Sequence, residues 1–131
     1  MKYLPIIFLM FFSTQIQAQK DQTQINENIY NTAGIQVQPE FPGGMTEFYK
    51  YIGQNYKTPN VKGLKGKIFL TFIIEKDGNL SDIKVIRDIG HGTGEEAVRI
   101  LKACPAWKPG EFNGEKVRVQ YSLPITIQSY I

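Results

Sequence analysis

His91 is the residue that most readily suggests chemistry, because it is the single histidine and lies in the run Gly90-His91-Gly92. An imidazole can bind a metal ion or accept a proton as a general base. Both uses need further ligands or acid–base partners at suitable spacing, and the neighbouring sequence supplies none. We therefore interpret His91 as a loop residue.

Cys104 is the only cysteine, so it cannot form a disulfide within the chain. It follows Ala97, Ile100 and Leu101 at helical spacing and directly precedes Pro105. Burial among apolar residues raises the pKa of a thiol and lowers its reactivity. We interpret Cys104 as a small core residue and not as a nucleophile.

Two charged features also have structural explanations. Glu95 and Glu96 are adjacent, and adjacent residues of a helix do not face each other, whereas both would interact favourably with a helix amino terminus. The glycine- and lysine-rich residues 63–67 lack the spacing and the final Ser or Thr of a phosphate-binding loop. The sequence therefore predicts no enzyme, no metal site, no cofactor and no small-molecule substrate.

The amino-terminal residues are typical of a cleavable secretory signal. Lys2 precedes an apolar run at residues 3–12, and Ala18 before Gln19 marks a cleavage site. The run is about half of the roughly 20 apolar residues that span a bilayer, and an uncleaved anchor is the alternative. We expect a signal peptide at residues 1–18, a polar lead-in at residues 19–38 and one domain at residues 39–131.

The charge balance argues against several classes of partner. The whole chain has a formal net charge of +3, and removal of the signal takes away one positive charge, Lys2, which leaves +2. So small an excess predicts neither nucleic-acid binding nor adsorption to a membrane. A secreted domain without a disulfide depends on its apolar core, and 42% of the residues are hydrophobic.

Two helices are expected to pack on the sheet. After the turn Pro42-Gly43-Gly44, the apolar residues Met45, Phe48, Tyr49 and Ile52 follow at helical spacing, which predicts a helix at residues 45–55. Thr93 and Glu96 have the spacing of a capping box at the start of a second helix. Pro105 ends that helix.

Three strands complete the expected fold. Residues 67–75 alternate, the turn Asp77-Gly78-Asn79 follows, and a second apolar run forms a hairpin with the first strand, which is the better candidate for the centre of the sheet. Residues 116–128 alternate as well, and Pro124 places that strand at a sheet edge or a bulge. The sequence predicts an α+β fold: a small antiparallel three-stranded sheet with both helices on one face, in the order α-β-β-α-β.

The last strand is the candidate binding element. An edge strand can pair with an extended peptide of a partner, whose main chain then provides the affinity, whereas a protected edge is the alternative explanation. Trp107, between Pro105 and Pro109, is expected to be a buried plug, and a ligand-stacking platform is the alternative. The predicted partner-binding residues are Lys116, Val117, Arg118, Val119, Gln120, Tyr121 and Ser122.

The chain resembles the carboxy-terminal domain of TonB, in the form typical of Bacteroidetes envelope proteins. The resemblance covers about residues 39–128. It is carried by Pro42, Gly43 and Gly44, by Gly66, by Asp77-Gly78, by Glu96, Ala97 and Arg99, by Pro105 and Trp107, by Pro109 and Gly110, by Gly114, and by the closing Leu123-Pro124-Ile125. These combined motifs are specific to the family.

The resemblance implies a periplasmic module that recognises the TonB box, a short peptide of outer-membrane TonB-dependent receptors, by pairing it with the final strand. Another envelope protein is a further candidate partner. The sequence departs from full-length TonB in having a signal and about 20 residues before the domain, so we expect recognition without transmission of force. The alternative is a structural or assembly protein that uses the same strand to form a homodimer or to bind a scaffold.

Overall fold

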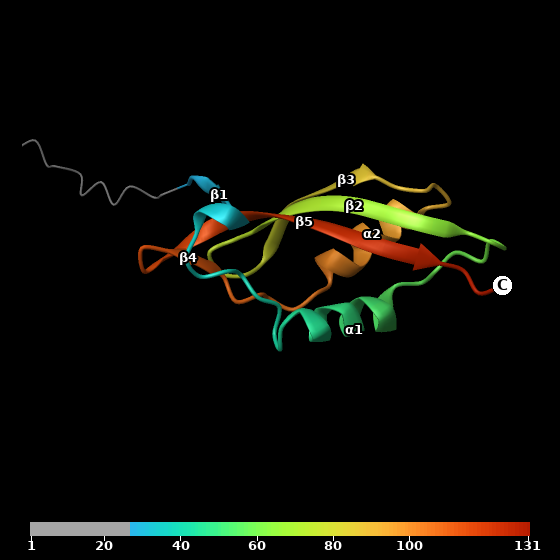
Figure 1. Cartoon of the computed structure of the whole chain (residues 1–131), viewed down its shortest axis with the longest axis horizontal. Coiled ribbons are helices and arrows are strands. Elements are labelled where there is room, and N and C mark those ends of the chain that lie inside the picture. Colours follow the sequence, from blue (N-terminus) through green and yellow to red (C-terminus); the bar gives the residue numbers. More distant parts are fainter. Residues whose placement is uncertain (1–26) are drawn as a thin grey trace, which may run out of the picture.

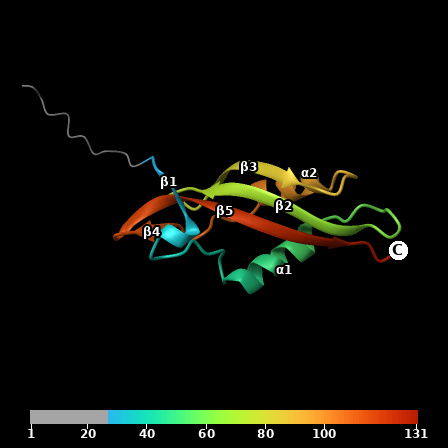
Figure 2. The same cartoon turned by 45° about the horizontal axis from the view of Figure 1, so that its top comes forward.

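The structure, a computed structural model, describes residues 27–131. The predicted signal peptide and the first part of the predicted lead-in lie outside the described residues. Figure 1 and Figure 2 show two helices, α1 and α2, against a long, twisted sheet. The elements are β1 (Ile29–Asn31), the 3-10 helix η1 (Thr32–Gly34), α1 (Met45–Asn55), β2 (Lys65–Ile74), β3 (Leu80–Arg87), α2 (Thr93–Lys102), β4 (Gly110–Phe112) and β5 (Glu115–Gln128).

The sheet contains the predicted three strands and two more. β2 pairs antiparallel with β3 on one side and with β5 on the other, so it is the centre of the three long strands, as predicted. The prediction of a three-stranded, purely antiparallel sheet is wrong, because β1 pairs parallel with β5 and β4 forms a hairpin with the start of β5. The fold is α+β with a mixed sheet of five strands in the order β1-β5-β2-β3, with β4 on β5.

The β4–β5 hairpin has a local signal that explains it. Asn113 and Gly114 both have positive φ, 51° and 80°. Two-residue hairpin turns of this kind favour Asn-Gly because both central residues need φ > 0. The lead-in also contributes to the fold, since Val37 bridges Glu111 of β4 through two backbone hydrogen bonds.

One face of the sheet and the two helices enclose the core. Alternate residues of β2 and β5 point to this face, as the period of a strand requires, and α1 contributes Phe48 and Ile52. The other two residues of the predicted apolar face, Met45 and Tyr49, are 39% and 52% exposed. Helix α1 therefore packs on the sheet along a narrower stripe than the sequence predicts. The buried β2 and β5 residues of the core cluster are Ile68, Leu70, Phe72, Ile74, Leu123, Ile125 and Ile127.

Helix α2 begins at Thr93, but not with the predicted capping box. Gly92, with φ of 75°, is the N-cap, and the Thr93 hydroxyl donates a 2.7 Å hydrogen bond to the Gly90 carbonyl. Glycine reaches this left-handed conformation without strain. Helix α2 ends at Lys102, before Pro105. Within residues 27–131, no helix is long and apolar enough to cross a membrane.

Trp107 is the buried plug that the sequence predicts. It is 2% exposed and contacts four aromatic rings, with centroid distances of 4.8–5.8 Å. Its backbone N–H donates to the Gly78 carbonyl at 2.8 Å, and a Cβ on Gly78 would lie 1.8 Å from the Trp107 oxygen. The β2–β3 turn and the Trp107 loop are thus locked together by a residue that must be glycine. The four rings belong to Phe41, Phe48, Phe72 and Tyr121.

Candidate functional site

His91 and Cys104 lie apart from each other on the described part of the chain, His91 in the loop before α2 and Cys104 just after that helix. His91 is exposed in its loop, with φ of 58°. Cys104 is partly buried against the core, and burial raises the pKa of its thiol, which disfavours the thiolate. Among residues 27–131, no group of three or more His, Cys, Asp or Glu side chains could hold a metal ion.

The two sides of β5 differ in what they pair with. The Ser129 N–H donates to the Leu64 carbonyl at 2.8 Å, directly beyond the last residues of the β2–β5 ladder. Hydrogen-bonded and non-hydrogen-bonded pairs alternate in an antiparallel ladder. Odd-numbered residues of β5 therefore direct their backbone groups to β2, and even-numbered residues direct theirs outward.

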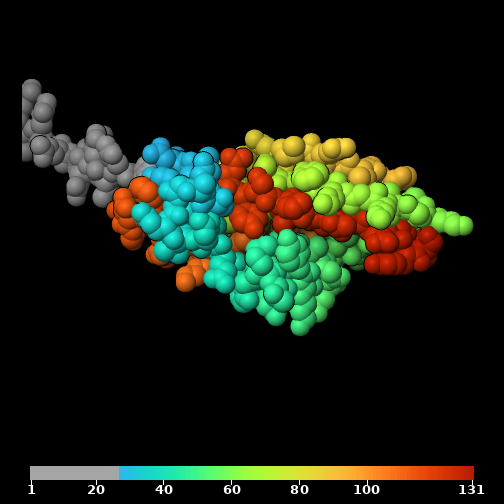
Figure 3. Space-filling model, viewed as in Figure 1, coloured from blue at the N-terminus to red at the C-terminus, as the bar shows by residue number. Residues whose placement is uncertain are grey.

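The outward side of residues 118–120, which we name the covered edge, is occupied by the chain itself. Ile29, Tyr30 and Asn31 of β1 oppose these three residues in a parallel arrangement. Figure 3 shows residues 27–40 as a blue and cyan mass over this part of β5.

The outward side of residues 122–128, which we name the open edge, has no strand beside it in the described part of the chain. In Figure 3, β5 emerges from beneath the cyan mass and continues between α1 and β2 to the carboxy terminus. Pro124 lies on this stretch at an even-numbered, outward position, so its missing N–H removes no hydrogen bond to β2. Of the two predicted alternatives, a sheet edge or a bulge, Pro124 itself lies at an edge, although β5 as a whole lies between β1 and β2.

The predicted site residues are thus divided between different surroundings. Lys116 and Val117 oppose β4, and the next three predicted residues oppose β1. β1 occupies the outward side of residues 118–120, whereas β4 pairs with Val117 on the same side of β5 as β2. The assignment of these residues to a partner site stays a prediction. Only Tyr121 and Ser122 lie beyond these pairings.

Helix α1 runs beside the open edge and places exposed apolar residues there. Met45 receives a 3.5 Å hydrogen bond at its sulfur from the Tyr121 hydroxyl. Farther along, Tyr49 and Gly53 of α1 and Pro124 and Thr126 of β5 line a shallow hollow. Met45 and Tyr49 therefore lie beside a row of outward backbone groups.

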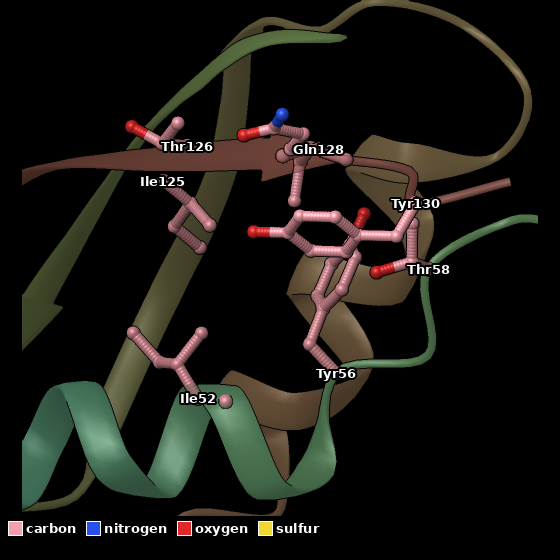
Figure 4. A pocket seen from close by; sticks show the side chains of 9 residues that line it. Ile52, Tyr56, Thr58, Ile125, Thr126, Gln128 and Tyr130 are labelled. Atoms are coloured by element: carbon pink, nitrogen blue, oxygen red, sulfur yellow. The ribbon is translucent and has the colours of Figure 1, made fainter. Parts of the chain in front are cut away.

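A second hollow continues the first toward the carboxy terminus. It lies between α1 and the end of β5 and is lined by Ile52, Tyr56, Ile125 and Tyr130 among others. Figure 4 shows Ile52 and Ile125 facing each other across the hollow, with the Tyr130 ring beside Tyr56 at its far end. The open edge is thus flanked by a continuous, partly apolar groove.

Glu96 and Arg99 hold α1 in this position. Arg99 Nη2 donates to the Asn55 carbonyl at 2.9 Å and to Glu96 Oε2 at 2.9 Å, and the Lys57 N–H donates to Glu96 Oε2 at 2.8 Å. The hydrogen bond from Arg99 lowers the pKa of Glu96, which stays ionised. The pair therefore fastens the end of α1 to α2, a role that the predicted capping box missed.

Tyr56 makes a further link between these helices. Its hydroxyl donates to the Thr93 carbonyl at 2.9 Å. Burial, and then the charge of Glu96, raise the pKa of Tyr56 to about 12. The phenol is thus held in its protonated, donating form.

The remaining motif residues shape the turns around β5. Gly44, with φ of 90°, is the N-cap of α1 and follows Pro42 and Gly43, while Ala97 is fully buried on α2. A Cβ on Gly110 would lie 2.8 Å from Val119 Cγ2 and 2.9 Å from Ile35 Cδ1. These residues position the elements that carry the edges. Pro105 and Pro109 flank Trp107 in the loop that leads to β4.

One solved structure agrees with this architecture. The solution structure of the TonB carboxy-terminal domain of Helicobacter pylori aligns with a TM-score of 0.51 and 20% identity, over 64% of this chain and 91% of that one. The same domain of Pseudomonas aeruginosa aligns with a TM-score of 0.43 and 18% identity, over 58% and 83% of the two chains. No curated protein matches.

The family described as Gram-negative bacterial TonB protein C-terminal matches residues 60–126, about half of the chain. This segment contains β2, β3, α2, β4 and most of β5. The chain therefore belongs to the TonB carboxy-terminal domain family.

Proposed function

We propose that the chain is a periplasmic, non-enzymatic binding module that recognises an extended peptide by adding it to the outward side of β5. The expected partner is the TonB box of an outer-membrane TonB-dependent receptor, or a similar segment of another envelope protein. The family is linked to TonB-dependent transport, and its domains are interaction modules of the Gram-negative envelope. The observation that carries the proposal is the open edge with its flanking groove.

The open edge offers what strand addition requires. Ser122, Thr126 and Gln128 each direct an N–H and a carbonyl outward, and Pro124 directs a carbonyl outward. Main-chain hydrogen bonds to such groups give affinity, while alternate side chains of the added strand enter neighbouring pockets. Tyr49 and the hollows along α1 are placed to receive those side chains.

A pair of substitutions at one residue tests this proposal. Thr126→Pro removes an outward N–H, whereas Thr126→Val keeps it and is the matched control. One net hydrogen bond contributes about 0.5–1.5 kcal/mol, so we expect the proline variant to bind a synthetic TonB-box peptide about twofold to tenfold more weakly. Isothermal titration calorimetry measures the affinity, and thermal melting checks that both variants are folded.

Two results would contradict the proposal at different points. Equal affinity of the proline and valine variants would contradict binding at the open edge. Absence of binding by the unsubstituted chain to TonB-box peptides from several receptors would contradict peptide recognition itself.

The same open edge supports the second candidate function, assembly through a homodimer. An unpaired strand with apolar neighbours is a surface on which a second copy can pair. Sedimentation velocity at several concentrations distinguishes the two candidates. A monomer at every concentration excludes the homodimer and leaves peptide recognition.

A further inference from the structure

The covered edge is the part of β5 where an added strand would form the most complete ladder. Arg118 and Gln120 direct both an N–H and a carbonyl outward, and Ser122 continues the row. The open edge lacks one donor at Pro124. β1 therefore pairs with the covered edge, where every outward residue has an N–H, whereas the open edge, which contains Pro124, has no strand beside it in the described part of the chain.

β1 is a short strand at the surface. It pairs over three residues, and Ile29 is 49% exposed. The Tyr30 ring stacks on Phe112 of β4 with a centroid distance of 5.1 Å. Arg118 Nη1 donates to the Glu27 carbonyl at 3.2 Å, and its Nε is bonded to Glu75. The contacts of this segment include that ring stack and the Arg118–Glu27 hydrogen bond. A strand that pairs over three residues is a small structure to displace.

The chain is fastened more firmly just beyond β1. Val37 and Glu111 exchange two backbone hydrogen bonds of 3.2 and 2.9 Å, and Glu40 and Lys108 exchange two of 2.9 and 2.7 Å. Gln36 Nε2 also donates to Asn113 Oδ1, and Gln36 Oε1 accepts from the Asn113 N–H. Residues before η1 can therefore leave β5 while residues 36–40 keep their place in the fold.

We propose that β1 is a built-in placeholder for the partner peptide, which displaces it and runs parallel to β5 from residue 118 onto the open edge. The proposal rests on the proposed function and adds the direction and chemistry of the partner. The displaced strand defines that chemistry: an extended segment with an aromatic or flat apolar side chain for Phe112 and a main-chain carbonyl for Arg118.

A reversible cross-link tests the placeholder. Asn31 and Gln120 are paired residues of β1 and β5, so Asn31→Cys with Gln120→Cys can lock β1 in place, in a chain that also carries Cys104→Ala. We expect the oxidised variant to bind a synthetic TonB-box peptide roughly tenfold or more weakly than its reduced form, because locked molecules are not competent to bind at the covered edge. The single Asn31→Cys variant, treated identically, is the control.

An unlocking variant gives the opposite expectation. Tyr30→Pro removes the backbone N–H of residue 30 and the aromatic ring that stacks on Phe112. We expect it to raise peptide affinity by roughly threefold to tenfold, because less of the protein is held in the occluded form. The matched control is Tyr30→Phe, which keeps both the backbone N–H at residue 30 and an aromatic ring against Phe112.

A second peptide tests the displacement of β1 without using a TonB-box peptide. A synthetic peptide with the sequence of residues 27–33 is expected to bind the Tyr30→Pro variant in trans and to slow hydrogen exchange of the Gln120 amide. Failure of this peptide to bind, failure of the cysteine pair to cross-link, or equal peptide affinity of oxidised and reduced forms would overturn the placeholder. If the residue 27–33 peptide binds and TonB-box peptides do not, the placeholder stands and the proposed function fails.

Discussion

The covered edge and the open edge of β5 belong to one strand but differ in their neighbours. Along both, alternate side chains such as Val119 and Ile125 are buried, and β2 pairs with the inward side. At residues 118–120 the outward side is occupied by β1, whereas at residues 122–128 it faces a groove beside α1. Proteins protect strand edges against unwanted pairing by covering them or by placing proline on them. In β5, the covered edge is protected by β1, and the open edge carries Pro124.

The largest expected effect comes from a substitution that destabilises the whole fold, and with it both the covered edge and the open edge. Gly78 has φ of 86°, and its Cβ would lie 1.8 Å from the Trp107 carbonyl oxygen. Backbone strain alone costs about 1–3 kcal/mol, and the steric conflict adds to it. We expect Gly78→Ala to lower the free energy of unfolding by more than about 3 kcal/mol, measured by urea denaturation. A loss below about 1 kcal/mol would contradict the lock between the turn and the Trp107 loop.

A second substitution should damage only the covered stretch. A Cβ on Gly110 meets Val119 and Ile35, which belong to β5 and to the segment after β1. Overpacking costs about 1–3 kcal/mol, so we expect Gly110→Val to lower stability by that amount and to speed amide exchange of Gln120. The Ile125 amide, which faces β2, should stay protected, and Gly110→Ala should give a smaller effect of the same kind. Equal deprotection of both amides would argue against separable stretches.

A third substitution sharpens the comparison at the open edge. Gly53 of α1 lines both hollows, and its Cβ would have no atom within 4 Å. Because glycine in a helix is less favourable than alanine by about 0.5–1 kcal/mol, Gly53→Ala should raise the free energy of unfolding by that amount. Gly53→Trp fills the groove and should weaken TonB-box peptide binding while the Gln120 amide stays protected. Unchanged binding by the tryptophan variant would exclude the groove from the site.

The smallest expected effect concerns pH. Tyr56 lines the second hollow, and its pKa is raised from 10.0 to about 12, first by burial and then by Glu96. A raised folded-state pKa stabilises the protonated form, so this contribution is present below pH 10 and is lost as the pH rises through about 12. Tyr56→Phe should therefore lose less stability over that pH interval than the unsubstituted chain. Parallel stability curves for the two proteins would contradict the coupling.

The sequence predicts the parts of this fold whose signals are local. The turn at Gly43-Gly44 and the helical spacing that follows it predict α1, and the alternation in residues 67–75 predicts the central strand. Pro105 and Pro109 indicate the rigid loop around Trp107. Tertiary pairing decides the rest. Ile29 and Tyr30 lie in a polar run without alternation, so nothing local predicts that they pair with residues almost 90 positions away.

The candidate site was predictable only in outline for the same reason. The sequence predicts β5 as the binding element, and the proline indicates an edge, but the position of β1 decides which residues of that edge are open. Glu96 shows the limit most clearly. Its spacing from Thr93 fits a capping box, whereas its partners in the fold include the backbone of Lys57, 39 positions away. Asn113-Gly114 was a local signal for the β4 hairpin that the strand pattern alone did not use.

Amide hydrogen exchange of β5 with and without a synthetic TonB-box peptide tests the central claim most directly. The free chain should show fast exchange at Ser122 and Thr126, whose N–H groups face outward, and slow exchange at Leu123 and Ile125, whose N–H groups face β2. With bound peptide, we expect exchange at Ser122 and Thr126 to slow, because the added strand accepts hydrogen bonds from them. Peptide binding that slows exchange elsewhere, for example along β3, and leaves Ser122 and Thr126 unchanged would contradict strand addition to β5.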